Sequence, residues 1–279
     1  MPQDRGAARA AISSIRLRKG HAVSEHVKTE LCNGVLVLTL QRPDKKNAIT
    51  GAMYDALSDA LDRAETDVAV KVVLFQGDGD SFTAGNDLAD FAAQSKSNSD
   101  EESPAFRFVK TIGNASKPLV AAVQGNAVGI GTTMLLHCDL VYLAEGARLV
   151  TPFVNLALVP EAASSWLLPA RIGHVRAYQM FALGEPMDAV TAVACGLANA
   201  VVPAGEVRQK AMAAAVTLTK RPAGSLNATK NLMRDIERIQ AQISAEGDLF
   251  KERLKTPEAR EAFAAFAERR PPNFANLPA

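Results

Sequence analysis

The sequence has few of the residues that mark several large classes of protein. Its three cysteines, Cys32, Cys138 and Cys195, are widely spaced and odd in number, which argues against a disulfide scaffold and predicts reduced thiols. Its four histidines are scattered without metal-ligand spacing, so we expect no metal site. No apolar run approaches the roughly 18 residues of a membrane-spanning helix. A net charge of +1 gives no reason to expect nucleic acid or a membrane surface as a partner.

Residues 1–24 differ in composition from the rest of the chain. They carry five basic side chains and lack the apolar stretch of a secretory signal peptide. Two interpretations stay open, an unstructured extension, which we favour, and an organellar transit peptide. The chain ends in Asn276–Ala279, which is not a peroxisomal Ser-Lys-Leu-type tripeptide. Together with the reduced cysteines, these features lead us to expect a cytoplasmic protein.

The hydrophobic pattern predicts an α/β protein. Apolar content of 48% and charged content of 22% are ordinary for a folded chain of 279 residues. Strand patterns alternate with helical ones up to Val202, and only helical patterns follow. We therefore expect an α/β core over residues 25–205 and a helical C-terminal region over residues 206–279.

Individual elements follow from periodicity and from turn residues. Strands are predicted over residues 27–30, 35–40, 70–77, 119–123 and 139–144, with a hairpin turn at Asn33-Gly34. One helix is predicted to begin at Thr50, and others cover residues 177–183, 189–196, 207–219, 226–250 and 257–268. Residues 94–103 are polar without apolar periodicity, which predicts a mobile loop.

The stretch Leu119–Thr133 is the one around which the chain is organised. An entirely apolar strand leads into three glycines within seven residues, Gly125, Gly129 and Gly131. The residues after Gly131 are predicted to start a buried helix, so unpaired N–H groups lie at the positive end of its dipole. Such groups can bind a developing negative oxygen. A tight turn without chemistry is the alternative.

A second turn of the same kind follows the predicted strand at residues 70–77. Asp78–Leu88 is rich in small residues and precedes another helical segment. If the two turns are neighbours, one N–H group from each can converge on a single oxygen atom. The sequence therefore predicts two N–H donors, and the fold decides whether they converge on the same oxygen atom.

Charged residues supply two further candidates. Glu161 follows the apolar stretch Val150–Pro160, and apolar surroundings raise the pKa of a carboxyl group toward the range of a general base. The alternative is a glutamate in the first turn of a helix, stabilised by the helix dipole. The adjacent Lys45 and Lys46 lie in a polar loop, where they could contact phosphates or simply be solvated.

Three motifs stand in a fixed order along the chain, namely Arg42-Pro43-…-Asn47-Ala48, Phe82–Leu88 and Lys117–Gly129. Together they resemble the enoyl-CoA hydratase/isomerase (crotonase) superfamily, and the similarity extends from about residue 26 to Asn273-Phe274. The resemblance implies a crotonase-like spiral of ββα units with a helical C-terminal trimerisation region. It also implies a homotrimer or hexamer that acts on acyl-CoA in fatty acid β-oxidation. Coenzyme A is then part of the substrate, and no separate cofactor is expected.

The resemblance assigns roles to individual residues. Family members hold the thioester oxygen by two backbone N–H groups, and these positions map to Asn86 and Ile130. The positions that meet the substrate map to Lys45, Lys46, Ala48, Ala84, Gly85, Asp87, Leu88 and Gly129.

Departures from the family pattern indicate the reaction. Hydratases of the family place two glutamates at positions that correspond here to Thr133 and Phe153, neither of which can exchange a proton with carbon. Glu161 instead matches the single glutamate of the peroxisomal-type Δ3,Δ2-enoyl-CoA isomerases. We therefore expect isomerisation of 3-enoyl-CoA to 2-trans-enoyl-CoA through an enolate, with Glu161 as the acid and base.

Several alternatives stay open. The same enolate could serve another crotonase reaction, such as hydration, CoA-ester hydrolysis or retro-Claisen cleavage. The chain could also be a non-catalytic acyl-CoA-binding homologue. A serine hydrolase built on Ser164 or Ser165 is the weakest alternative, because no Gly-x-Ser-x-Gly elbow surrounds either serine.

Overall fold

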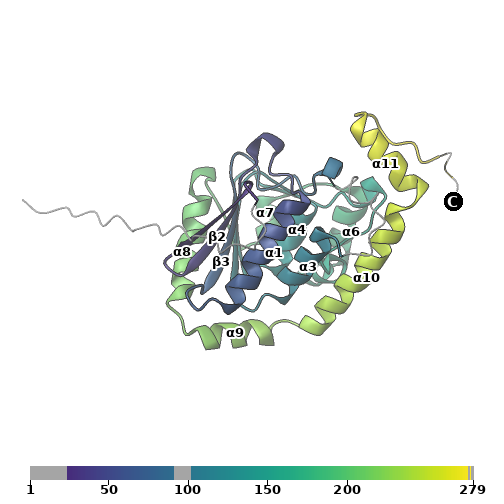
Figure 1. The fold of residues 1–279 in the computed structure, drawn as a ribbon. Coiled ribbons are helices and arrows are strands. Elements are labelled where there is room, and N and C mark those ends of the chain that lie inside the picture. Colours follow the sequence, from purple (N-terminus) through teal and green to yellow (C-terminus); the bar gives the residue numbers. More distant parts are fainter. Residues whose placement is uncertain (1–23, 91–101, 276, 278–279) are drawn as a thin grey trace, which may run out of the picture.

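The computed structural model describes residues 24–90, 102–275 and 277. The predicted extension at residues 1–24 lies outside the described residues except for Ser24, as do residues 94–101 of the predicted loop. Figure 1 shows a sheet flanked by helices, with the C-terminal helices running along one side of the molecule. None of the described helices is long and apolar enough to cross a membrane.

Six strands form the main sheet in the order β1-β2-β3-β4-β6-β9. They are β1 (Val27–Cys32), β2 (Val35–Leu40), β3 (Val72–Gly77), β4 (Leu119–Val123), β6 (Leu140–Ala144) and β9 (Ala200–Val202). The β1–β2 pair is an antiparallel hairpin, and every other neighbouring pair is parallel. The predicted hairpin turn is confirmed, because Asn33 and Gly34 have φ angles of 53° and 79°, as a two-residue turn of this kind requires.

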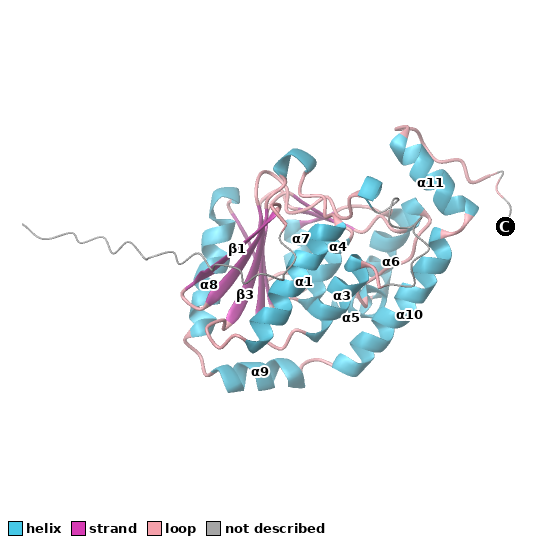
Figure 2. Ribbon diagram, viewed as in Figure 1, coloured by secondary structure: helices cyan, strands magenta, loops and turns pink. Residues whose placement is uncertain are grey.

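Helices cover both faces of the main sheet, which explains its continuous apolar strands (Figure 2). In β4, the odd-numbered residues share a core with α1 (Gly51–Thr66) and α3 (Pro104–Asn114). The even-numbered residues pack with α8 (Val207–Thr219) on the other face. A strand buried on both faces has no polar side, so the unbroken apolar run predicted β4 to the residue.

A second, smaller sheet holds the glycine-rich turn. Its strands, in the order β5-β7-β8, are β5 (Asn126–Val128), β7 (Arg148–Val150) and β8 (Met187–Asp188). The turn is followed by α4 (Ile130–Thr133) and a 3-10 turn, Met134–His137, where one buried helix was predicted. The sequence did not predict β5, because three residues are too few to show an alternating pattern.

Helices form most of the remainder of the described chain. They are α5 (Ser164–Ile172), α6 (His174–Leu183), α7 (Ala189–Ala194), α9 (Ala223–Leu232), α10 (Ile236–Leu254) and α11 (Pro257–Ala267). Short 3-10 turns lie at Pro43–Lys45, Val154–Leu156 and Ala204–Glu206.

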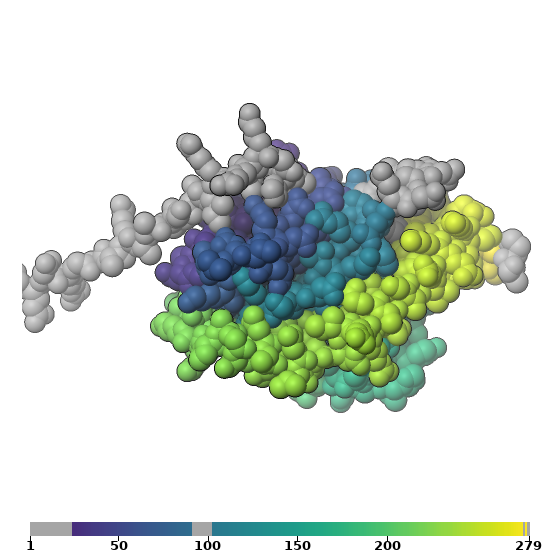
Figure 3. All heavy atoms as spheres, turned by 60° about the horizontal axis from the view of Figure 1, so that its bottom comes forward, coloured from purple at the N-terminus to yellow at the C-terminus, as the bar shows by residue number. Residues whose placement is uncertain are grey.

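The prediction of one helix over residues 226–250 was wrong, because the chain breaks between α9 and α10. Asp235 begins α10 as its N-cap, and its carboxylate accepts a 3.0 Å hydrogen bond from the Arg238 N–H group. Figure 3 shows the C-terminal helices as a continuous green-to-yellow band along the core. Within this band, α10 packs against α3, so the C-terminal region lies directly on the α/β core.

Candidate active site

The two glycine turns that were predicted to carry donors lie against each other. A parallel bridge joins Thr83 to Ala127, and the Val128 N–H group donates to the Thr83 carbonyl oxygen at 3.0 Å. Gly85 has a φ of +86°, and a Cβ at this position would lie 2.8 Å from the carbonyl oxygen of Val128. Only glycine fits such an approach. The fold therefore makes the two glycine turns neighbours, which the prediction of two N–H donors on one oxygen required.

The backbone N–H groups of Asn86 and Ile130 are the predicted donors. Asn86 directly follows Gly85, and Ile130 is the first residue of α4. Neither N–H group donates to another residue in the described part of the chain, whereas those of Asp87 and Gly129 bond to carbonyl oxygens at 2.9 and 2.8 Å. Two unpaired donors where two turns meet can stabilise a developing negative oxygen. Their role as an oxyanion hole stays a prediction.

A buried asparagine, Asn47, fastens the second glycine turn to the loop before α1. Its amide nitrogen donates to the carbonyl oxygens of Asp78, Ser81 and Phe82 at 2.7, 2.9 and 3.2 Å. Its Oδ1 atom accepts a 2.8 Å hydrogen bond from the Arg42 N–H group. The sequence gives no local signal for this role of Asn47, because its partners lie more than 30 residues away.

Glu161 is tied to the end of α4. The Thr133 hydroxyl donates a 2.6 Å hydrogen bond to Oε1 of Glu161, and Thr133 lies one turn after Ile130 on the same short helix. Helix α5 begins only at Ser164. Glu161 therefore precedes the helix, and the alternative of a first-turn glutamate does not describe it.

The surroundings of Glu161 set its acidity. Burial raises the pKa of Glu161 to about 7, the Thr133 hydrogen bond opposes that rise, and the charge of Glu246 adds to it. A carboxyl group of this acidity is populated in both protonation states near neutral pH. It can therefore take a proton from carbon and return one, as the sequence-based interpretation requires.

Tyr54 connects α1 to the second glycine turn. The Tyr54 hydroxyl donates to Oδ1 of Asn86. Burial raises the pKa of Tyr54 well above its ordinary value, and the charge of Glu161 raises it further. Tyr54 is thus a neutral hydrogen-bond donor, and it lies within range of the charge of Glu161. Glu161 therefore contacts α4 through Thr133, and its charge acts on Tyr54, which is bonded to Asn86. No motif in the sequence points to Tyr54.

The two positions to which the resemblance assigns hydratase glutamates, Thr133 and Phe153, hold no acid here. Thr133 is buried and its hydroxyl is engaged by Glu161. Phe153 is buried with its ring centroid 6.2 Å from that of Phe181. Thr133 instead orients the carboxylate of Glu161. The sequence does not indicate this role, because the contact joins residues 28 positions apart.

The predicted phosphate-binding lysines lie at the surface. Lys45 ends the 3-10 turn Pro43–Lys45, and both Lys45 and Lys46 are exposed. The Nζ atom of Lys46 lies 2.6 Å from Oδ2 of Asp80. An exposed ion pair contributes little free energy, so this pairing leaves Lys46 able to exchange its partner for a phosphate.

The remaining predicted substrate contacts surround an internal ion pair. The Arg42 guanidinium donates to the Ala48 carbonyl oxygen at 3.1 Å and to Oδ2 of Asp87 at 2.7 Å. The other oxygen of Asp87 accepts hydrogen bonds from the N–H groups of Ala89 and Asp90, both at 3.1 Å, where a helical segment begins at Leu88. Ala84 is exposed, and its N–H group donates to the Lys46 carbonyl oxygen at 2.8 Å. Asp87 therefore holds the loop in shape and is already paired.

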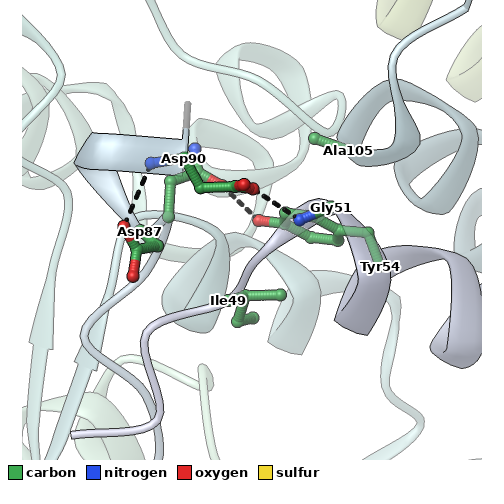
Figure 4. Close-up of a pocket in the computed structure, with 7 residues that line it drawn as sticks. Ile49, Gly51, Tyr54, Asp87, Asp90 and Ala105 are labelled. Atoms are coloured by element: carbon green, nitrogen blue, oxygen red, sulfur yellow. Dashed lines mark hydrogen bonds between the residues drawn. The ribbon is translucent and has the colours of Figure 1, made fainter. Parts of the chain in front are cut away.

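A small pocket opens next to the Asn86 turn (Figure 4). It is lined by Ile49, Gly51, Tyr54, Asn86, Asp87, Asp90 and Ala105. On one wall, the Gly51 N–H group at the start of α1 donates to Oδ2 of Asp90 at 2.7 Å. Neither Glu161 nor Ile130 lines this pocket, so it adjoins the predicted site on the Tyr54 side.

The fold identifies the class to which this protein belongs. The crystal structure of an enoyl-CoA hydratase/isomerase from Pseudoalteromonas atlantica T6c matches this chain with a TM-score of 0.85. The two sequences are 40% identical, and the match covers 90% of this chain and 100% of that one. The protein therefore has the crotonase fold with a helical C-terminal region, as predicted.

Sequence comparison then gives the family. A sequence model of the enoyl-CoA hydratase/isomerase family matches residues 30–277. Enoyl-CoA delta isomerase 2 of Rattus norvegicus is 35% identical over 85% of this chain, although the match covers 62% of that protein. A probable enoyl-CoA hydratase of Rhodobacter capsulatus is 31% identical over 89% of this chain and 97% of its own length. The chain belongs to the enoyl-CoA hydratase/isomerase family, and its relatives carry both kinds of name.

Proposed function

We propose that this protein converts 3-enoyl-CoA esters to 2-trans-enoyl-CoA esters, with Glu161 as the only acid and base. One observation carries the proposal. Glu161 has a pKa of about 7 and is held by Thr133, while the positions of the two hydratase glutamates hold Thr133 and the buried Phe153. A hydratase needs a base that activates water and an acid that protonates carbon. A double-bond shift needs one base that reaches both carbons.

The proposed reaction begins at C2 of the substrate. Ionised Glu161 removes a proton from C2, and the electrons of the C–H bond move into a planar dienolate that ends on the thioester oxygen. The protonated Glu161 then returns the same proton to C4, and the double bond moves from C3 to C2. No atom is gained or lost, so the product has the mass of the substrate.

The N–H groups of Asn86 and Ile130 are proposed to hold the thioester oxygen during this step. Such donors stabilise the negative enolate oxygen more than the neutral carbonyl, so they lower the barrier to proton removal. The loss of one donor of this type typically costs ~2.7–4 kcal/mol. Lys45 and Lys46 are proposed to meet the phosphates of coenzyme A at the surface.

The test is to incubate the purified protein with 3-hexenoyl-CoA and, separately, with 2-hexenoyl-CoA. We expect 3-hexenoyl-CoA to give conjugated-enoyl absorbance at unchanged mass. We expect Glu161→Gln to lower turnover by about 10²–10⁴-fold while CoA-ester binding stays nearly unchanged. Glu145→Gln, at an exposed glutamate, is the matched control and should be fully active.

Other outcomes identify the alternatives. A gain of one water from 2-hexenoyl-CoA would make the protein a hydratase, and release of free coenzyme A would make it a hydrolase. Ester binding without turnover of either substrate would favour the non-catalytic interpretation. An active Glu161→Gln variant would remove Glu161 from the mechanism.

A further inference from the structure

We propose that Glu246, on the C-terminal helix α10, is a positioning residue that fixes the backbone carrying Glu161. This inference rests on the proposed function of Glu161. Glu246 is 6% exposed, so nearly all of its side chain lies inside the protein. Its position in the sequence, within a helical stretch more than 80 residues after Glu161, gives no hint of such a role.

Glu246 caps the helix that follows Glu161. One of its carboxylate oxygens accepts a 2.6 Å hydrogen bond from the Ala163 N–H group. The other accepts hydrogen bonds from the Ser165 N–H group, at 2.9 Å, and from the Ser165 hydroxyl. Gln242, one turn earlier on α10, donates to the same hydroxyl at 2.8 Å. Both carboxylate oxygens of Glu246 are therefore committed to the residues just after Glu161.

Helix α5 requires such a partner from outside. Its N-cap residue is Ala163, whose side chain cannot accept a hydrogen bond from the first N–H groups of the helix. Ala162 and Ala163 both have positive φ angles, 63° and 56°, which non-glycine residues adopt only when surrounding contacts hold them. A buried carboxylate at a helix N-terminus supplies both the acceptor and the charge that this end of a helix favours.

A second contact holds the same turn from the opposite side. Nε2 of His137 lies 2.8 Å from the carbonyl oxygen of Ala162, and Nδ1 of His137 lies 3.3 Å from Nη2 of Arg234. A carbonyl oxygen only accepts, so Nε2 carries the hydrogen and Nδ1 accepts from Arg234. The Ala162–Ala163 peptide is thus held at both of its polar groups, the N–H by Glu246 and the C=O by His137.

The consequence is positional. Thr133 orients the carboxylate of Glu161. The direction of the Cα–Cβ bond of Glu161 depends on the following backbone, which Glu246 and His137 hold. Misplacement of a catalytic group by about 1 Å can cost on the order of 10²-fold in rate. Removal of the Glu246 cap should therefore lower the rate of proton transfer while leaving the binding of coenzyme A, at the other end of the substrate, in place.

The test is a double-mutant cycle on the intact protein with 3-hexenoyl-CoA as substrate. Glu246→Gln keeps the size of the side chain but replaces one acceptor oxygen with an amide that faces an N–H group. We expect its kcat to fall by about 10- to 100-fold with KM changed by less than about threefold. In a Glu161→Gln background the same substitution should lower the residual kcat by less than about twofold, because it acts only through Glu161.

Two further variants complete the experiment. Ser165→Ala removes one donor to Glu246 and leaves both backbone hydrogen bonds, so it should fold and lower kcat by a smaller factor. Glu252→Gln, at an exposed glutamate on the same helix, should be fully active. An unchanged kcat in both Glu246→Gln and Ser165→Ala would overturn the proposal, and so would equal losses of kcat in the two Glu161 backgrounds.

Hydrogen exchange separates this inference from the proposed function. Peptides that cover Glu161–Leu168 should exchange at least about tenfold faster at the Ala163 and Ser165 amides in Glu246→Gln than in the wild type. If the wild type shows no isomerase activity but this acceleration occurs, the proposed function fails and the Glu246 cap stands. If the wild type is active and the exchange is unchanged, the Glu246 cap fails and the proposed function stands.

Discussion

The hydroxyl of Thr133 donates a 2.6 Å hydrogen bond to the carboxylate of Glu161. This bond joins the helix that carries one predicted oxyanion donor to the predicted base. It also favours the ionised form of Glu161, and so opposes the burial that raises the pKa of Glu161 to about 7. The pKa of Glu161 therefore reflects a balance between burial and the Thr133 hydrogen bond, and a substitution that alters either one should change it.

Thr133→Val should move the pH dependence of the reaction. In the proposed mechanism ionised Glu161 is the active form, so kcat/KM should fall as the pH drops through about 7 in the wild type. Loss of the Thr133 hydrogen bond removes an interaction that lowers the pKa, so the pKa rises and the ascending limb moves to higher pH by roughly one unit. A pH profile of kcat/KM measures the shift.

Thr217→Val is the matched control for this prediction, because Thr217 is exposed on α8. Its profile should coincide with that of the wild type. A Thr133→Val profile with an unmoved or lowered limb would show that the hydrogen bond does not control the titrating group.

Gly85→Ala should damage both stability and activity. Gly146 has a similar φ of +80° but no atom within 4 Å of an added Cβ, whereas Gly85, at +86°, approaches the Val128 carbonyl oxygen. Gly146→Ala should therefore cost about 1–2 kcal/mol for the backbone conformation alone. Gly85→Ala should cost a further ~1–3 kcal/mol for the overlap and lower turnover. Urea denaturation measures the stabilities, and equal losses in the two variants would contradict the close approach.

Asn47→Ala should destabilise the protein although it removes only one small side chain. Asn47 satisfies three carbonyl oxygens in the second glycine turn, and a buried polar group left unpaired costs about 1–3 kcal/mol. We expect a loss of roughly 3 kcal/mol in the free energy of unfolding, together with reduced activity. Asn231→Ala, at an exposed position on α9, should change the free energy by less than about 0.5 kcal/mol.

His137→Gln should make the protein more resistant to acid. Burial, followed by the charge of Arg234, lowers the pKa of His137 to about 3 from an ordinary value of 6.5. The folded state therefore excludes a proton that the unfolded chain binds, and stability is lost as the pH falls below 6.5. The slope is about 1.4 kcal/mol per pH unit.

Glutamine at position 137 can still donate to Ala162 and accept from Arg234, but it does not titrate. Denaturation curves of the two proteins between pH 7.5 and pH 4 should therefore diverge as the pH falls. Parallel loss of stability in both proteins would show that His137 is not protonated on unfolding in this range.

The parts of the structure that could be predicted from the sequence are those determined by neighbouring residues. β4 was predicted to the residue because both of its faces are buried, and the hairpin turn because Asn33 and Gly34 tolerate positive φ. The motifs also gave the family and the fold. The break at Asp235 was missed, because its capping role competes with a helical pattern that continues on both sides.

The site was predictable only in part. Asn86, Ile130 and Glu161 stand in motifs, so the sequence could propose them. Thr133 was read only as a missing acid, and Glu246 was not noticed, because each acts through a contact that exists only after the chain has folded. One interpretation of the sequence was that Glu161 is a glutamate at a helix N-terminus. In the structure the carboxylate at the N-terminus of α5 belongs to Glu246.

The cap that α10 provides to α5 restricts how this chain can be recombined with its relatives. A chimera that joins the core of this protein to a relative's C-terminal helices must bring an acceptor to the position of Glu246. Without one, the N–H groups of Ala163 and Ser165 would be buried and unpaired. Modules exchanged at the predicted boundary near residue 205 are therefore not independent, because a residue of α10 holds the turn that follows Glu161.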